Sequence, residues 1–122
     1  MKAGGFDNAG TAFELTRDGV GWDFHTLYSF TGTNPNDGPW GSLAVDSAGN
    51  LYGIRGTSIP TPVVFKLTHA DGGWTSSVLH ASTIADGQYI PGTLSVDASG
   101  NVYGTAIAGG AHGHGTVWEI TP

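Results

Sequence analysis

Cysteine is absent from the sequence and charged residues are scarce, and each shortage excludes a class of protein. Without cysteine the chain has neither a disulfide framework nor a thiolate metal site. The absence of cysteine also gives no indication of the redox compartment in which the protein resides. Lys and Arg number 4 against 10 Asp and Glu, which gives a net charge of −6 at pH 7. Because such a chain repels phosphate backbones, we expect no nucleic-acid partner.

Long apolar runs are also lacking, so the sequence predicts no membrane span. Met1 and Lys2 are followed by Ala-Gly-Gly rather than by an apolar stretch, so no signal peptide is visible. The 122 residues fit one small domain, and a hydrophobic content of 39% is too high for a disordered acidic chain. Glycine, by contrast, is abundant at 21 residues, and clusters of it bound the apolar runs.

An internal match is the strongest signal in the sequence. Residues 13–16 read Phe-Glu-Leu-Thr, residues 65–68 read Phe-Lys-Leu-Thr, and residues 118–121 read Trp-Glu-Ile-Thr, at spacings of 52 and 53. Gly-Asn-Leu-Tyr-Gly at 49–53 likewise matches Gly-Asn-Val-Tyr-Gly at 100–104, at a spacing of 51. A period of roughly 50 residues is typical of propeller blades.

These matches predict a single β-repeat domain over residues 1–122. Its units span approximately 11–62 and 63–115, and a third, partial copy occupies 116–122. Short runs of β-branched and aromatic residues predict nine strands, and no window has the period of a helix longer than one turn. The predicted strands are 11–16, 22–30, 42–46, 50–54, 63–68, 74–82, 93–97, 101–106 and 116–121. The predicted fold is all-β, with two four-stranded propeller-type blades plus one extra strand.

The connections between these strands are of two kinds. Residues 46–50 and 97–101 begin with Asp and carry Gly in fourth place, which predicts tight hairpins with a positive φ at Gly100. The connections at 31–41, 55–62, 83–92 and 107–115 are longer. In an up-and-down blade the long loops gather on one face, where we expect any binding surface.

Several of these motifs resemble the GloVer tandem repeats of bacterial proteins. They are Gly-Asn-Leu-Tyr-Gly at 49–53, Val-Phe-Lys-Leu-Thr at 64–68, Leu-Tyr-Ser-Phe-Thr-Gly at 27–32, and the stretch 109–121, which runs from Gly-Gly to Gly-Thr-Val-Trp-Glu-Ile-Thr. The resemblance implies a β-propeller and an extracellular or cell-surface location, and it supplies no catalytic residues. Family members usually carry many repeats, whereas this chain carries about two, and residues 55–62 depart from the glycine-rich pattern.

Two aromatic residues in long loops are candidates for ligand binding. Trp40 and Tyr89 lack an aromatic counterpart in the other copy, and exposed aromatic rings on a loop face stack on sugars or anchor a partner. The other interpretation is that they pack as a lid over a blade edge. Aromatic residues that recur at matched positions are instead expected to pack between blades. These are Trp22 with Trp74, Tyr52 with Tyr103, and Phe13 with Phe65 and Trp118.

Ionisable residues give weaker indications. His112 and His114 flank a glycine and form a candidate ligand-binding pair, but no third metal ligand lies near them, so we predict no metal site. The Asp residues at turns offer too few oxygens for Ca²⁺, and no catalytic motif accompanies them. We therefore expect no cofactor and no enzymatic activity.

The small number of units predicts self-association. Two blades leave two faces open, and a repeat array needs about three units for stability. Either several chains assemble or the chain is part of a longer one, and the initial Met and terminal strand favour assembly. We expect a structural, extracellular homo-oligomer in which one terminal strand completes a blade of the next chain, giving a filament or ring. The alternative is a module that binds a carbohydrate or cell-surface ligand through its long loops.

Overall fold

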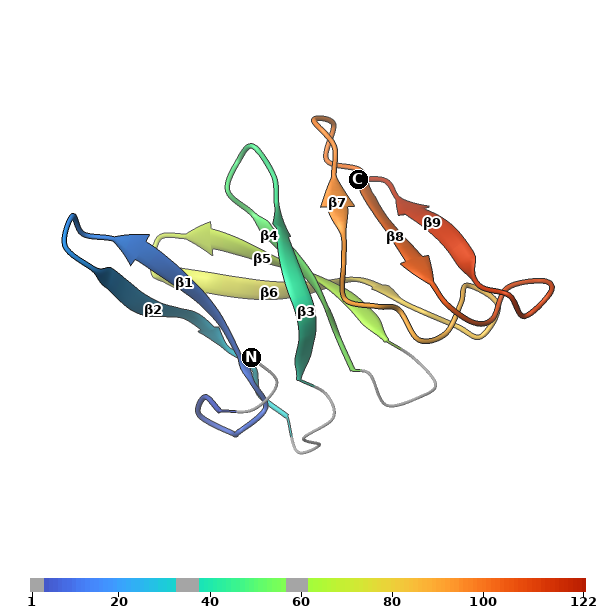
Figure 1. The fold of residues 1–122 in the computed structure, drawn as a ribbon, viewed down its shortest axis with the longest axis horizontal. Helices are drawn as coiled ribbons and strands as arrows, with labels where there is room; N and C mark the ends of the chain where they lie inside the picture. The colour runs from blue at the N-terminus through green and yellow to red at the C-terminus, as the bar shows by residue number, and fades with distance from the viewer. Residues whose placement is uncertain (1–3, 33–37, 57–61) are drawn as a thin grey trace.

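The computed structural model describes residues 4–32, 38–56 and 62–122, and within these residues the chain is all-β, without a helix (Figure 1). This confirms the predicted fold class, and each predicted strand has an observed counterpart. The strands are β1 (Thr11–Arg17), β2 (Trp22–Ser29), β3 (Pro39–Val45), β4 (Leu51–Arg55), β5 (Val63–Ala70), β6 (Gly73–Ala81), β7 (Ser95–Val96), β8 (Val102–Ala106) and β9 (Thr116–Ile120).

The strands form three antiparallel sheets, and none of them closes on itself. Their orders are β1-β2, β3-β4-β5-β6 and β7-β8-β9, with the four-stranded sheet between the other two (Figure 1). The prediction of two four-stranded sheets plus one strand is therefore wrong in its partition. Each predicted unit contains two long connections, and the pattern alone does not say which of them changes sheet. In the structure β4 pairs with β5 across the predicted unit boundary, and the sheets separate after β2 and β6.

The hairpin turns follow from their Asp and Gly residues. The Asp46 carboxylate accepts hydrogen bonds from the backbone N–H groups of Ala48 (2.9 Å) and Asn50 (2.9 Å). Gly49 then adopts a φ of 82°, and Gly100 in the matching turn adopts 85°. These values confirm the predicted positive φ at Gly100. A residue that carries a Cβ rarely adopts such a φ.

The core lies where the four-stranded sheet faces its neighbours. Phe65 and Leu67 of β5 are completely buried, and they belong to a cluster that includes Phe30, Ala9 and Ala12 from the N-terminal part of the chain. The rings of Phe30 and Phe65 meet edge to face at 5.1 Å, a favourable geometry for aromatic pairs. A second cluster joins the other side of the sheet to β8 and the segment before β7; it contains Ile54, Val64, Ile90 and Ala106.

The aromatic residues at matched positions differ in burial. The prediction that they pack between sheets is confirmed for Phe65 and Tyr52, which are buried, whereas Trp74 and Trp118 are half-buried. It is wrong for Trp22 and Phe13, which are 67% and 40% exposed, because β1 and β2 form a sheet of only two strands in the described part of the chain. Burial therefore depends on how many strands surround a position.

Two glycines bring β3 of the second sheet into direct contact with the segment that precedes β7. A Cβ built on Gly41 in β3 would overlap the backbone of Gly92, and a Cβ on Gly92 would overlap the backbone around Trp40. The Ser42 N–H donates a hydrogen bond of 2.9 Å to the Gly92 carbonyl. Gly41 and Gly92 occupy matched sequence positions, 51 residues apart, although only Gly41 lies within a strand.

The two kinds of connection lie at opposite ends of the strands. The turns between β3 and β4 and between β7 and β8 project from one side of the molecule, and the connection from β8 to β9 leaves from the other (Figure 1). Residues 33–37 and 57–61, which the sequence assigns to long loops, lie outside the described residues.

Candidate functional site

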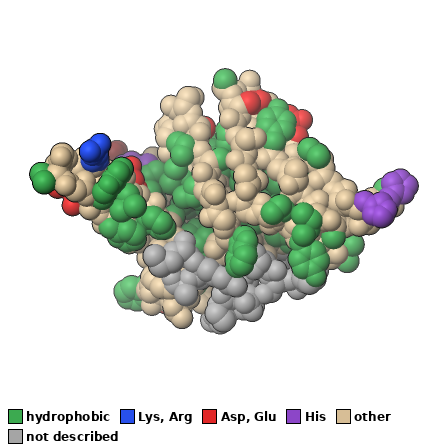
Figure 2. All heavy atoms as spheres, in the orientation of Figure 1, with side chains coloured by type: hydrophobic (Ala, Val, Ile, Leu, Met, Phe, Trp, Pro, Cys, Tyr) green, Lys and Arg blue, Asp and Glu red, His purple; other side chains and the backbone are tan. Residues whose placement is uncertain are grey.

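The four predicted ligand-binding residues lie on neighbouring segments. The prediction that Trp40 lies in a long loop is wrong: it lies in β3, which begins at Pro39, it is 44% exposed, and its backbone packs on Gly92. Tyr89 is 50% exposed and has a φ of 53°, and its carbonyl accepts a hydrogen bond from the Ile107 N–H (3.3 Å). His112 and His114 are exposed in the connection from β8 to β9, where histidine side chains project from the molecule (Figure 2).

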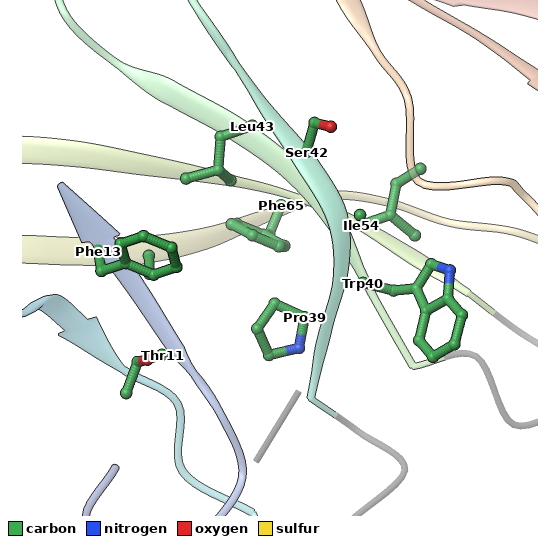
Figure 3. Close-up of a pocket in the computed structure, with 10 residues that line it drawn as sticks. Thr11, Phe13, Pro39, Trp40, Ser42, Leu43, Ile54 and Phe65 are labelled. Atoms are coloured by element: carbon green, nitrogen blue, oxygen red, sulfur yellow. The ribbon is translucent and has the colours of Figure 1, made fainter. Parts of the chain in front are cut away.

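The structure does not gather these four side chains in one pocket. A hollow of about 230 Å³ lies beside Trp40, and neither Tyr89 nor a histidine lines it (Figure 3). Phe13 and Phe65 lie on one side of β3, and the Trp40 indole is directed to the other side. The hollow is lined by Thr11, Ala12, Phe13, Pro39, Trp40, Gly41, Ser42, Leu43, Ile54 and Phe65. None of these carries an ionisable side chain, so the described lining offers apolar contact rather than acid–base chemistry.

A second hollow continues along the same edge of β1. Its volume is about 430 Å³, and it shares Phe13 and Leu43 with the first. Leu27, Val45, Leu51 and Trp74 are further apolar residues of its lining. Together the two hollows form an apolar trench between β1 and the four-stranded sheet; hydrophobic side chains lie on the visible face of this end of the molecule (Figure 2).

Two other hollows lie along β9. One of about 280 Å³ is lined by β9 residues together with Val64, His80, Ser82, Ala85 and Asp86. The other, of about 170 Å³, lies between Tyr52, Lys66 and Leu79 on one side and the end of β9 on the other. The four hollows therefore follow two strands, β1 and β9, that lie at edges of the described sheets.

The sequence match explains why these two edges are hollow. By that match, β1 and β9 correspond to β5, and β2 corresponds to β6. The first sheet thus holds only the third and fourth strand positions of the four-stranded sheet, and the third sheet holds only the first three. The hollows are lined by residues of β1 or β9, the strands at which the two incomplete sheets end. Each incomplete sheet has strand positions that the other lacks, and both have the third.

The same position in three strands shows what a complete neighbour provides. Phe65 lies over Gly53 of β4, where an added Cβ would come within 2.5 Å of the ring. Trp118 of β9 lies over Gly104 of β8 in the same way. Phe13 is the matching residue of β1, but no strand that carries a glycine pairs with it in the described structure, and it is 40% exposed. Phe13 stacks instead on Phe24 of β2, with ring centroids 5.0 Å apart.

A hydrogen-bonded cluster recurs in the two hairpins, and its tyrosines were not predicted to take part. Asp46 accepts hydrogen bonds from the Asn50 side chain (2.8 Å) and the Tyr52 hydroxyl (2.9 Å). The hydrogen bond from the Asn50 side chain is the main reason that the pKa of Asp46 is lowered from 3.8 to about 2. The shared spacing of Asp, Asn and Tyr in both copies was the sequence signal that could have revealed this cluster.

The matching cluster extends to β9. Asp97 accepts hydrogen bonds from Asn101 (2.8 Å) and Tyr103 (3.0 Å), and Tyr103 also donates to Glu119 of β9 (2.9 Å). The hydrogen bond to Glu119, followed by that to Asp97, raises the pKa of Tyr103 to about 12. In the four-stranded sheet the residue that matches Glu119 is Lys66, whose Nζ lies 5.4 Å from the centre of the Tyr52 ring.

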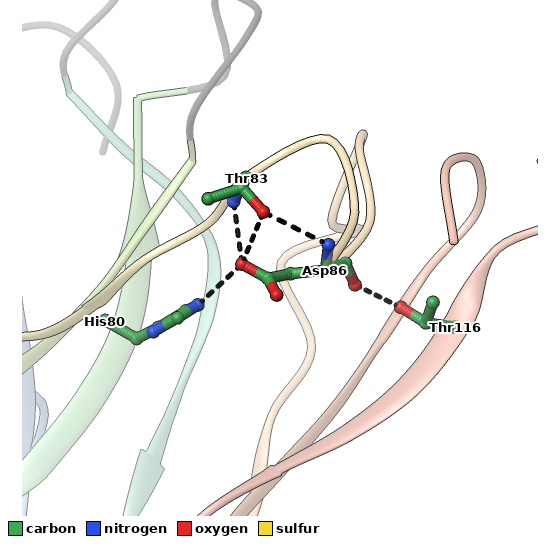
Figure 4. A network of polar contacts seen from close by, with 4 residues as sticks. All are labelled: His80, Thr83, Asp86 and Thr116. Carbon is green, nitrogen blue, oxygen red and sulfur yellow. Dashed lines mark hydrogen bonds and ion pairs between the residues drawn. The ribbon is translucent and has the colours of Figure 1, made fainter. Parts of the chain in front are cut away.

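A second polar network links β6 to the connection that follows it (Figure 4). The Asp86 carboxylate accepts hydrogen bonds from the Thr83 N–H (2.8 Å) and hydroxyl (2.9 Å), and it lies 3.1 Å from His80 Nε2. The bond from the Thr83 N–H is the main reason that the Asp86 pKa is lowered. The Thr116 hydroxyl donates to the Asp86 carbonyl (2.5 Å), which ties this loop to β9. His80 and Asp86 are 44% and 42% exposed, so the network fixes a surface loop.

Further observations concern metals, membranes and similar proteins. Within residues 4–32, 38–56 and 62–122, no three His, Asp or Glu side chains are close enough together to hold a metal ion. The described residues also contain no helix of the length and apolar character needed to cross a membrane. Comparison with known protein families, curated proteins and solved structures finds no match to this chain.

Proposed function

We propose that this protein is a non-catalytic structural module whose three sheets act as propeller-type blades and which self-associates into a ring or filament. The observation that carries the proposal is that each incomplete sheet has strand positions that the other lacks: the first sheet has the fourth, the third sheet has the first and second, and both have the third. An edge strand beside an apolar hollow is a site for pairing with another chain. Pairing of the first sheet of one copy with the third sheet of the next would bring the hollows at both ends into one junction.

The arrangement of neighbouring sheets supports their description as blades. β3 lies against β7, and β2 lies against β6. Each of these pairs joins matched strands of adjacent sheets, so successive sheets stack like against like. Radial repetition of antiparallel sheets is the principle of a propeller. The extracellular location that we propose rests on the resemblance of the motifs to GloVer repeats.

The first experiment measures the size of the purified chain. We expect light scattering and sedimentation over a range of concentrations to give species larger than the monomer, and electron microscopy to distinguish rings from filaments. A chain that remains monomeric at every concentration would refute the proposal.

A matched pair of variants then tests the edge of β1. Leu15 is half-exposed in β1, whereas the residues that match it, Leu67 and Ile120, are buried and half-buried. Completion of this sheet would bury Leu15, so Leu15→Lys is expected to block assembly while leaving the monomer folded, because burial of an unpaired ammonium group is costly. Val20→Lys, at a fully exposed turn residue, is the control and should assemble normally.

A second candidate function is binding of a carbohydrate or cell-surface ligand through the long loops. The half-exposed rings of Tyr89, in a long loop, and of Trp40, near the start of β3, favour it, since exposed aromatic rings stack on sugar faces. A glycan array probed with the wild-type chain and with Trp40→Ala tests this function. Binding that is lost in the variant supports it, and the absence of binding by the wild type argues against it.

A further inference from the structure

In the proposed assembly, β1 of one copy and β9 of the next compete for the same edge of β8. β1 and β9 both match β5, the third strand of the complete sheet. When the first sheet of one copy joins the third sheet of another, two strands fit the same edge of β8 in the receiving copy, namely its own β9 and β1 of the other copy. Its own β9 already occupies that edge, in a register that pairs Tyr103 with Glu119 and Gly104 with Trp118.

The apolar contacts at this edge suit β1. Gly104 lies beneath the Trp118 ring, as Gly53 lies beneath Phe65. Phe13 of β1 is the residue that matches both aromatic rings, and it lacks a glycine beneath it within the described chain. A glycine on β8 therefore supplies the surface that Phe13 lacks.

The polar contacts also suit β1. Tyr103 donates a hydrogen bond to Glu119 in β9, and the matching residue of β1 is Glu14, which is again a carboxylate. The matching residue of β5 is Lys66, which lies over the ring of Tyr52 rather than accepting from its hydroxyl. At this position β1 thus resembles β9 more closely than it resembles β5.

Two features make the pairing of β9 with β8 easier to displace. The Trp118 Nε1–H is buried without a hydrogen-bond partner, which is unfavourable, and phenylalanine at that position carries no such donor. In addition, β9 pairs with β8 over five residue pairs, whereas β1 pairs with β2 over seven. Displacement of β9 therefore preserves the longer ladder, and displacement of β1 would break it.

We propose that, in the assembly, the β1–β2 hairpin of one copy replaces β9 on β8 of the next copy, with Phe13 over Gly104 and Glu14 beside Tyr103. This inference rests on the proposed self-association and adds the identity of the exchanged strand. The receiving sheet then has the order β7-β8-β1-β2, with four strands, and β2 lies where the hollow between β9 and β6 is open in the single chain. β9 of the receiving copy is then no longer part of this sheet.

The absence of cysteine makes the test direct, because introduced thiols have no native competitors. Chains carrying Glu14→Cys are mixed with chains carrying Tyr103→Cys, assembled, and oxidised. Any disulfide between the two kinds of chain is intermolecular by construction. A Ser76→Cys chain, with its thiol at an exposed position of β6, replaces the Glu14→Cys chain as the matched control. The double variant Tyr103→Cys/Glu119→Cys, which should form an intramolecular disulfide in the monomer, shows that the substituted chain folds.

The expected result is a Glu14→Cys/Tyr103→Cys heterodimer at least tenfold above the control. A second mixture, His25→Cys with Glu119→Cys, detects the opposite exchange, in which β2 leaves β1 and pairs with β9; its register follows from the pairing of Glu14 with His25. Cross-linking of this second mixture alone would overturn the inference and leave self-association intact. Assembly without either cross-link would also overturn it. A chain that stays monomeric would instead refute the proposed function itself.

Discussion

The four-stranded sheet and the two-stranded sheet beside it share Phe and Leu at matched positions of β5 and β1, but these residues differ in burial. Phe65 and Leu67 of β5 are completely buried, whereas Phe13 and Leu15 of β1 are 40% and 50% exposed. The phenylalanine and the leucine are the same in the two strands, whereas their surroundings differ. β5 has a strand on each side, and β1 has β2 on one side and a hollow on the other within the described chain. Burial in this fold is therefore a property of the complete sheet.

The largest difference between the two sheets should appear on truncation of their matched phenylalanines. Phe65→Ala removes a fully buried ring and is expected to lower the free energy of unfolding by about 3–5 kcal/mol. Phe13→Ala in the monomer should cost less, about 1–2 kcal/mol, because Phe13 remains 40% exposed after folding. Denaturant unfolding of both variants at a concentration that keeps the chain monomeric measures the difference. Equal losses would show that the two positions are equivalent in the monomer.

A second comparison separates close packing from backbone strain. Gly41 and Gly49 have φ values of 81° and 82°, but only Gly41 lies against another backbone; a Cβ on Gly49 would meet nothing within 4 Å. Gly49→Ala should therefore cost about 1 kcal/mol for its φ alone. Gly41→Ala adds a steric clash with Gly92, for a total of about 2–4 kcal/mol. Thermal or denaturant midpoints of the two variants decide the matter, and a smaller loss for Gly41→Ala would contradict the packing role.

The hairpin clusters predict how stability depends on acid. The folded pKa of Asp46, about 2, lies below its ordinary value of 3.8, so its hydrogen bonds stabilise the fold above about pH 4. That contribution is lost as the pH falls from about 4 toward about 2. Asp46→Asn should flatten this part of the curve of unfolding free energy against pH. Asp97, whose pKa is also lowered, contributes in the same direction, so the double variant should be flatter still.

The smallest effect on the monomer is expected at Trp22. Its side chain is 67% exposed, so Trp22→Ala should change the unfolding free energy by less than about 0.5 kcal/mol. Trp74, its match in β6, is half-buried against the core and meets the His69 ring at 5.1 Å, so Trp74→Ala should lose clearly more. Both are measured by chemical denaturation. A large loss for Trp22→Ala would mean that the two-stranded sheet is better packed than its exposure indicates.

The sequence predicted the strands well because their signals are local. Alternating apolar residues and the Asp-to-Gly turns define the nine strands, and positive φ at Gly49 and Gly100 follows from residues within four positions. The division of these strands into sheets could not be predicted from local sequence patterns. Whether β4 pairs with β5 or ends a sheet depends on how the chain crosses between layers, and both connections in a unit are long and polar.

The candidate site was less predictable than the fold. Trp40 and Tyr89 were identified as exposed aromatic residues, and they are half-exposed, but they do not share a hollow with His112 or His114. The trench beside Phe13 was not foreseen, because a buried and an exposed phenylalanine carry the same pattern. Hydrogen bonds such as that from Thr116 to the Asp86 carbonyl join residues 30 apart, beyond the reach of any local motif.

The contact between Gly41 and Gly92 has a consequence for the shape of any larger object built from this chain. There β3 meets the segment before β7 through backbone atoms rather than through side chains that adapt by changing rotamer. The angle between them is therefore held tightly, and an error in that angle would be multiplied at every step of an array. The contact therefore sets the curvature of an assembly within each copy. One added methyl group at either glycine would alter the circumference of a ring or the pitch of a helix.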